Sequence, residues 1–212
     1  MKLYFSKGAC SLTVRIIINE LGLSCDYETV DLKTKKTAGG NNFLEVNPKG
    51  AVPTLMTNDG DTLTENAVIL QYLADTSKAD TLLPPVGKFS RYQVLEWLNY
   101  VATEMHKTVG QLFNPNLPEQ TKQSLTIPLI KSKLNYINQH LKQHTYLLGE
   151  HFTLPDAYMF VILRWAQAFQ FDFKEWPNIK RYFDLLLQRD SVKKSLDEEG
   201  IRQQPSGAQC AI

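Results

Sequence analysis

The sequence predicts a small α/β domain followed by an all-helical domain. Three observations lead to this fold class. Strand and helix patterns alternate up to about residue 80, residues 76–88 contain three proline and glycine positions typical of a linker, and helical periods dominate after residue 89. We place the domains at residues 1–81 and 87–203, which suits a chain of 212 residues.

The first half begins with a predicted strand, helix, strand and loop. Residues 2–5 and 27–32 are rich in the residue types that strands favour. Between them, a helix with one apolar face begins near Ser11 and ends at Gly22. Residues 33–42 contain two adjacent glycines and few apolar side chains, so we expect a loop there.

A hairpin and a second helix complete the first domain. The Asn-Asp-Gly run at 58–60 separates residues 52–57 from 61–63, which is a strong hairpin pattern. We expect a helix to follow from Asn66 and to turn four side chains inward: Val68, Ile69, Tyr72 and Leu73. One crossover and one antiparallel pair therefore form an α/β layer.

The second half shows apolar residues at helical spacing. Residues 129–141, 154–169 and 179–187 are predicted as amphipathic helices. Thr153 followed by Asp156 is typical of a capping box at the start of the second of these. The all-helical prediction for this half depends on these periods.

Charge and cysteine usage argue against several functions. The 23 Lys and Arg residues nearly balance 22 Asp and Glu residues, so no net charge favours nucleic acid or an anionic membrane. The longest aliphatic run, 16–18, is far shorter than the roughly 18 residues that span a bilayer. We expect no metal site and a reducing, cytoplasmic setting, because the cysteines are few and widely spaced: Cys10, Cys25 and Cys210.

Cys10 is the first candidate for chemistry. It precedes Ser11 and the predicted first helix, where free backbone N–H groups and the helix dipole favour a thiolate. The alternative is an inert, packed cysteine. Because no second cysteine follows within three residues, any redox chemistry at Cys10 requires a thiol from a small molecule.

Two further segments have both a structural and a functional interpretation. Pro53 after Val52 is either an ordinary proline at a strand start or a cis-proline turn that frees the Val52 backbone for a peptide-like ligand. Glu65 and Asn66 open a helix, either as capping residues or as a site for the ammonium and carboxylate of an amino acid. His106 alone is more typical of a structural histidine.

Several motifs along the chain match one known family. They are Met1-Lys2-Leu3-Tyr4, Gly8-Ala9-Cys10-Ser11-Leu12, Asp31-Leu32-Lys33-Thr34-Lys35-Lys36-Thr37, Asn47-Pro48-Lys49-Gly50-Ala51-Val52-Pro53, Leu63-Thr64-Glu65, Gln71-Tyr72-Leu73-Ala74-Asp75, Glu96-Trp97-Leu98-Asn99, Glu104-Met105-His106-Lys107 and Phe152-Thr153 to Asp156-Ala157-Tyr158. Val-Pro followed by Glu at a helix start is shared by glutathione transferases in general. The combination of Cys10 with His106 resembles the bacterial beta class.

The resemblance implies a thioredoxin-like N-terminal domain, a helical C-terminal domain that lines the electrophile site and the dimer interface, and a homodimer. It implies a transferase that joins the thiolate of its co-substrate glutathione to small hydrophobic electrophiles, with accessory thiol–disulfide exchange through Cys10. Cys10 and His106 would be catalytic, and Glu104 would reach the neighbouring subunit's site. The implied glutathione-binding residues are Cys10, Lys35, Val52, Pro53, Glu65, Asn66, Asn99, Thr103, Glu104 and His106.

One departure from the family keeps a second function open. The family usually has a small residue, often Ser, where this chain has Asn66. A different placement or weaker binding of glutathione would then suit a non-catalytic carrier of hydrophobic ligands on the same scaffold. Conjugation of glutathione remains the preferred hypothesis.

Overall fold

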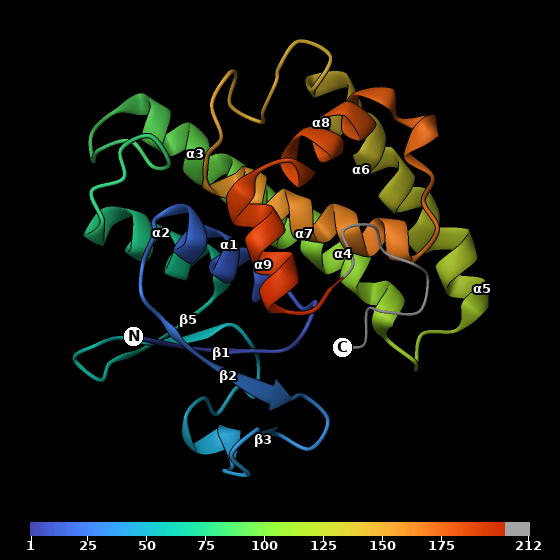
Figure 1. The fold of residues 1–212 in the computed structure, drawn as a ribbon. Helices are drawn as coiled ribbons and strands as arrows, with labels where there is room; N and C mark the ends of the chain where they lie inside the picture. Colours follow the sequence, from blue (N-terminus) through green and yellow to red (C-terminus); the bar gives the residue numbers. More distant parts are fainter. Residues whose placement is uncertain (202–212) are drawn as a thin grey trace.

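The computed structural model describes residues 1–201 and begins with a five-stranded mixed sheet of order β3-β2-β1-β4-β5 (Figure 1). Strands β1 and β2 are parallel, and the other neighbouring pairs are antiparallel. The strands are β1 (Lys2–Phe5), β2 (Asp26–Asp31), β3 (Lys36–Thr37), β4 (Thr54–Met56) and β5 (Thr62–Thr64).

The two faces of the sheet belong to different apolar clusters. Leu3 and Phe5 alternate with Tyr4 along β1, so they point to the opposite face. Leu3 and Phe5 join the main core together with helices α1 (Leu12–Glu20) and α2 (Asn66–Thr76). Tyr4 packs instead on Phe43 of the short 3-10 helix η1 (Phe43–Glu45), with ring centroids 5.6 Å apart.

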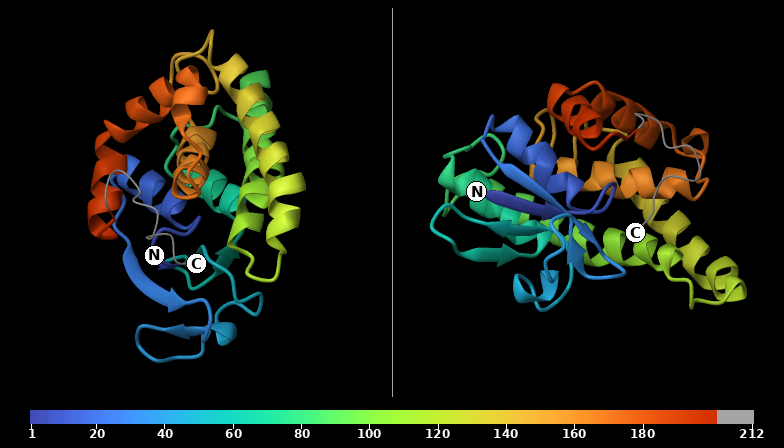
Figure 2. Two further views of the ribbon diagram at one scale, coloured as in Figure 1. Left: turned by 90° about the vertical axis from the view of Figure 1, so that its right-hand side faces the viewer. Right: turned by 60° about the horizontal axis from the view of Figure 1, so that its bottom comes forward.

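The helical half surrounds one buried helix. Helix α7 lies between α8 and α9 on one side and α3, α4 and α6 on the other (Figure 2). The helices are α3 (Phe89–Tyr100), α4 (Lys107–Gly110), α5 (Glu119–Thr121), α6 (Ile127–His140), α7 (Leu154–Ala168), α8 (Pro177–Leu187) and α9 (Asp190–Glu198). The π-helical segment η2 (Val101–His106) joins α3 to α4, and the π-helical segment η4 (Lys122–Thr126) precedes α6. Two further 3-10 turns are η3 (Gln111–Phe113) and η5 (Phe173–Glu175).

The start of α7 confirms the predicted capping box. The Thr153 N–H donates to Asp156 over 2.8 Å, and the Thr153 hydroxyl donates to the same carboxylate over 2.9 Å. The other oxygen of Asp156 accepts from the Leu147 N–H and the Tyr182 hydroxyl. These four bonds satisfy a fully buried carboxylate and hold the preceding loop and α8 against the start of α7.

Arg15 on α1 ties the two halves of the molecule together. Its guanidinium donates through Nε to Glu199, just beyond α9, over 3.0 Å, and it stacks 3.6 Å from the centroid of the Tyr27 ring. Both Arg15 and Glu199 are buried. Because α1 also contacts α7 and α9, the helical half covers the face of α1 that the sheet leaves open.

The predicted fold class, α/β followed by all-helical, is confirmed, with two local corrections. Residues 33–42 are not all loop, because Lys36–Thr37 pairs with β2. Val68 and Tyr72 are 44% and 36% exposed, because α2 packs through Ile69, Leu73 and their neighbours only. Cys210 and the last two positions predicted for the second domain lie outside the described residues.

Candidate active site

A cavity of about 350 Å³ contains residues from both halves of the molecule. The sheet half contributes the N-terminus of α1, the turn before β4 and the start of α2, while η2 and α7 contribute from the helical half. Six of the ten predicted site residues line it: Cys10, Val52, Pro53, Glu65, Asn66 and His106.

The loop before Cys10 is held by the helical half. The Gly8 N–H donates to buried Glu199 over 2.9 Å, and the Gly8 carbonyl accepts from the Trp165 indole over 2.9 Å. Cys10 itself is partly buried, and its thiol donates to the Val52 carbonyl over 3.2 Å. The sulfur therefore faces the turn that contains Pro53.

Burial decides the protonation state of Cys10. It raises the pKa of the thiol to about 12, although the backbone N–H groups of Cys10 and Ser11 act in the opposite direction. The N–H groups at the start of α1 do favour the thiolate, as expected, but burial has the larger effect on the pKa and acts against it. Removal of the sulfur from water outweighs the local N–H groups, so Cys10 is a thiol at neutral pH.

The Val52–Pro53 peptide is cis, which confirms that part of the second interpretation of this proline, whereas pairing of the Val52 backbone with a ligand stays a prediction. Asn47 holds the turn, because its amide donates to the Ala51 carbonyl over 2.8 Å and to the Thr54 hydroxyl over 3.0 Å. Val52 is thereby presented at the cavity opposite Cys10.

Glu65 and Asn66 do not cap α2 with their side chains. Glu65 has a φ of 70°, in the left-handed region, and its carboxylate is exposed and 2.7 Å from Lys49 Nζ. Asn66 is buried and donates to the Cys10 carbonyl over 2.9 Å, while its Oδ1 has no hydrogen-bond partner in the described structure. Both side chains therefore remain available for a role other than capping.

His106 lies at the end of the π-helical segment η2, a type of distortion that is frequent at functional sites. Its Nδ1 is 2.5 Å from the Tyr158 hydroxyl, and its ring meets the Trp165 ring edge to face at 4.9 Å. Burial, assisted by the positive charge of Lys107, lowers the pKa of His106 to about 4. The imidazole is therefore neutral at pH 7.

The remaining four predicted residues do not line this cavity. Lys35 donates to the Gly50 carbonyl over 2.8 Å, at the outer side of the turn before Pro53. Asn99, Thr103 and Glu104 are exposed. Thr103 donates to the Asn99 carbonyl over 3.0 Å, and Glu104 pairs with Lys133 of the same chain over 2.5 Å.

The predicted site residues omit five polar residues that line the cavity: Asn47, Lys49, Thr64, Lys107 and Tyr158. Lys49 lies in the matched Asn-Pro-Lys-Gly-Ala-Val-Pro motif, so that motif could have suggested it. Tyr158 is 52 positions away from its partner His106 and lies in a helix whose residues are nearly all buried. It ends the matched segment Asp156-Ala157-Tyr158, but nothing in that segment indicates a contact with His106.

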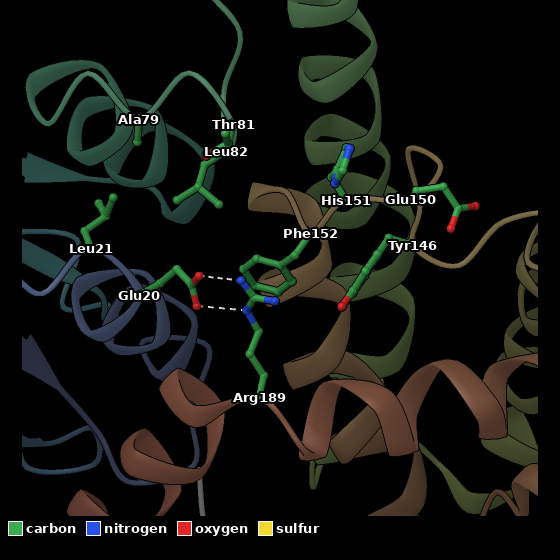
Figure 3. A pocket seen from close by; sticks show the side chains of 10 residues that line it. All are labelled: Glu20, Leu21, Ala79, Thr81, Leu82, Tyr146, Glu150, His151, Phe152 and Arg189. Atoms are coloured by element: carbon green, nitrogen blue, oxygen red, sulfur yellow. Dashed lines mark hydrogen bonds and ion pairs between the residues drawn. The ribbon is translucent and has the colours of Figure 1, made fainter.

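A second cavity, of about 410 Å³, lies beside the C-terminus of α1 and the N-terminus of α9 (Figure 3). Its central charges neutralise one another, since Arg189 donates to both carboxylate oxygens of Glu20. The guanidinium also lies 4.0 Å from the centroid of the Phe152 ring. Among the described lining residues there is no cysteine, so the candidate nucleophile is in the smaller cavity.

Residues 1–201 contain neither a cluster of metal ligands nor a membrane-spanning helix. No group of three or more His, Cys, Asp or Glu side chains there is arranged to hold a metal ion. No helix within the same residues has the length and apolar character needed to cross a membrane.

Comparison with known proteins is consistent with the geometry. Family models for the glutathione S-transferase N-terminal and C-terminal domains match residues 8–76 and 100–190. Glutathione S-transferase GstA of Escherichia coli O157:H7 is 42% identical over 202 residues, which cover 95% of this chain and 100% of that protein.

Two solved structures are also similar. The bacterial beta-class glutathione S-transferase of Sphingomonas chungbukensis has a TM-score of 0.91 and 37% identity, covering 95% of this chain and 100% of that one. A sphingomonad glutathione S-transferase, complexed with glutathione, has a TM-score of 0.91 and 36% identity, and the match again covers 95% of this chain and 100% of that one. The chain therefore belongs to the glutathione S-transferase family and, within it, to the bacterial beta class, with a thioredoxin-like first domain and the transferase activity of that family.

Proposed function

We propose that this glutathione S-transferase binds glutathione in the cavity beside Cys10 and joins its thiolate to small hydrophobic electrophiles. The observation that carries the proposal is the convergence of Cys10, the cis-Pro53 turn, Glu65 and His106 on one cavity. The similar sphingomonad enzyme, whose structure is described as a complex with glutathione, supports the choice of thiol.

The charges at the start of α2 suit the γ-glutamyl end of glutathione. Glu65 can accept from an ammonium, while Lys49 and the N-terminus of α2 can receive a carboxylate. The Lys49–Glu65 pair is exposed, so exchanging it for contacts with the ligand costs at most about 1 kcal/mol. The Val52 backbone would pair with the cysteinyl part, and Lys35 would face the glycyl carboxylate.

The reaction needs the thiolate of glutathione and an apolar place for the second substrate. The thiol releases its proton to solvent, the sulfur electron pair forms the new bond to carbon, and a leaving group such as a halide departs with its electrons. Each pKa unit by which hydrogen-bond donors such as His106 lower the pKa of the glutathione thiol corresponds to about 1.4 kcal/mol of thiolate stabilisation. Beyond His106, the partly buried ring of Phe113 packs on Trp165, and the ring of Phe169 packs on Phe113, so these rings offer a wall for a hydrophobic electrophile.

Cys10 is proposed to support a slower exchange reaction. Its thiolate would attack the glutathione sulfur of a mixed disulfide, so that Cys10 becomes glutathionylated and the other thiol leaves as its thiolate. A second glutathione thiolate would then attack the glutathione sulfur on Cys10, restoring the Cys10 thiolate and releasing oxidised glutathione. Because burial raises the pKa of Cys10 to about 12, this reaction should be slow at neutral pH and should speed up with pH. Conjugation uses the thiolate of glutathione instead and does not require Cys10 as nucleophile.

We also propose a homodimer in a reducing, cytoplasmic setting. Large apolar side chains are exposed on α2 and α3, among them Tyr72, Phe89 and Tyr92. A second copy would cover such residues, and Glu104 would then approach its neighbour's site. Free Cys10 and Cys25 are consistent with a reducing compartment. Light scattering of the purified protein measures the mass directly, and a monomer would reject the dimer.

Initial rates of conjugation to an activated aryl halide test the proposal, with wild type beside Cys10→Ala. We expect comparable rates, together with loss of disulfide exchange in the variant. Loss of conjugation in the variant alone would make Cys10 essential to it. Absence of turnover in both proteins, with tight binding of a hydrophobic dye, would instead support the carrier function.

A further inference from the structure

Tyr158 makes a close contact with the candidate catalytic histidine from the opposite wall of the cavity. It lies on α7, is 2% exposed, and places its hydroxyl 2.5 Å from His106 Nδ1. The two rings meet edge to face at 5.7 Å, with an interplanar angle of 77°. Ring packing and the hydrogen bond together hold the imidazole in one orientation.

The direction of this hydrogen bond follows from the protonation of its partners. Burial raises the pKa of Tyr158 above its ordinary value and lowers that of His106 to about 4, so both groups are neutral at pH 7. The hydrogen bond joins the protonated phenol oxygen of Tyr158 to Nδ1 of the His106 imidazole. If the phenol donates, Nδ1 is the acceptor and the single ring hydrogen of His106 is on Nε2.

The relative basicity of the two groups supports the same direction. The nitrogen of a neutral imidazole is a stronger base than a phenol oxygen, and a phenol O–H is a stronger acid than an imidazole N–H. The phenol of Tyr158 therefore donates to His106 Nδ1, and this bond links α7 to the π-helical segment η2 across the cavity.

We propose that Tyr158 is a positioning residue that keeps His106 in the tautomer with hydrogen on Nε2. In this state His106 acts on bound sulfur as a neutral hydrogen-bond donor through Nε2, and Nδ1 is unavailable as a base. The inference deepens the proposed function, since it assigns how His106 serves that same site. The charged or titratable groups around His106 are Lys107 beside it, Glu65 on α2, Tyr158 on α7 and Cys10.

The test combines nitrogen NMR of the histidine rings with kinetics. Protein labelled with ¹⁵N-histidine contains four histidines, and the spectrum of His106→Asn identifies the His106 signals. Wild type should show a single tautomer, protonated on Nε2. Tyr158→Phe keeps the ring but removes the hydroxyl, so the His106 shifts should become those of mixed tautomers. Tyr136→Phe, at an exposed ring on α6, is the matched control.

Kinetics decide whether the tautomer matters. Loss of the hydrogen bond between the Tyr158 hydroxyl and His106 should lower kcat for conjugation about fivefold to tenfold in Tyr158→Phe, while the KM for glutathione stays within about twofold of wild type. Tyr136→Phe should match wild type.

If the spectrum of the wild-type protein shows His106 protonated on Nδ1, this result alone overturns the inference. An unchanged tautomer or an unchanged kcat in Tyr158→Phe also overturns it. Failure of the proposed function is distinct, since wild type would then neither bind glutathione in calorimetry nor turn over, whatever its tautomer.

Discussion

Replacing Glu199 by glutamine tests the buried link between the C-terminal helix and the loop before Cys10. One carboxylate oxygen accepts from Arg15 Nε over 3.0 Å, and the other accepts from the Gly8 N–H over 2.9 Å. The Glu199 side chain is fully buried, and that of Arg15 is 3% exposed. Glutamine has nearly the same shape but one oxygen and no charge, so it cannot accept both bonds.

The expected loss follows from what remains around Arg15. Removing one partner of a buried ion pair costs about 3–5 kcal/mol, because the other charge stays buried without its partner. Glu198 still lies 3.3 Å from the guanidinium, and the new amide still accepts one bond, so we expect the lower end, about 3 kcal/mol. At about 2–4 °C for each kcal/mol, this lowers Tm by roughly 6–12 °C.

Urea unfolding and scanning calorimetry measure the change. Burial raises the pKa of Glu199, so the comparison belongs at about pH 8 rather than at a lower pH, because a higher pH favours the ionised carboxylate. Protein concentration is held constant, because self-association would shift Tm. Glu198→Gln is the control, and it should cost less than about 1 kcal/mol, since that side chain is 32% exposed. Equal, small losses in both variants would refute the reasoning and leave the Tyr27 stack as the main support of Arg15.

Three further predictions concern the cavity. Alkylation of Cys10 by iodoacetamide should accelerate about tenfold per pH unit between roughly pH 7 and 10, since its pKa is about 12; a plateau near neutral pH would show an activated thiolate. Glu65→Gln should raise the glutathione KM about tenfold, from the loss of one charge-assisted bond, and more than Lys49→Ala does; equal KM values would remove Glu65 from the binding site. The pKa of His106 falls from 6.5 to about 4 on folding, so the unfolded chain binds the proton more tightly, and the free energy of unfolding drops by up to about 3 kcal/mol as the pH falls through this range. In urea unfolding, the stability advantage of wild type over His106→Asn should therefore shrink between pH 7 and pH 4. A constant advantage over this range would contradict the pKa shift.

Local sequence patterns were sufficient to predict an element wherever neighbouring residues determine its conformation. The period of apolar residues predicted α6, α7 and α8 to within about two residues at each end. Thr153 and Asp156 predicted a capping box three residues apart, and the structure contains it. The Asn-Asp-Gly run predicted the hairpin of β4 and β5. In each case the residues that decide the conformation are adjacent in the chain.

The same reasoning failed where a distant segment decides the environment. Val68 and Tyr72 are apolar and lie near the inward face of α2, yet the packing of that helix leaves them exposed. Lys36–Thr37 is polar and beside a glycine pair, yet the edge of β2 pairs with it. Neither outcome can be predicted from the local composition, because each depends on which surfaces come into contact after folding.

For the site, the sequence by itself determined several of the participants, and the tertiary structure decided which other residues join them and their chemical state. The motifs around Cys10, Pro53, Glu65 and His106 identified the family and four residues that share one cavity. Cys10 is nevertheless a thiol and His106 a neutral imidazole, because segments far away in the chain exclude water from both. Desolvation depends on everything that surrounds a group, so it emerges only when the two halves of the molecule close around the cavity.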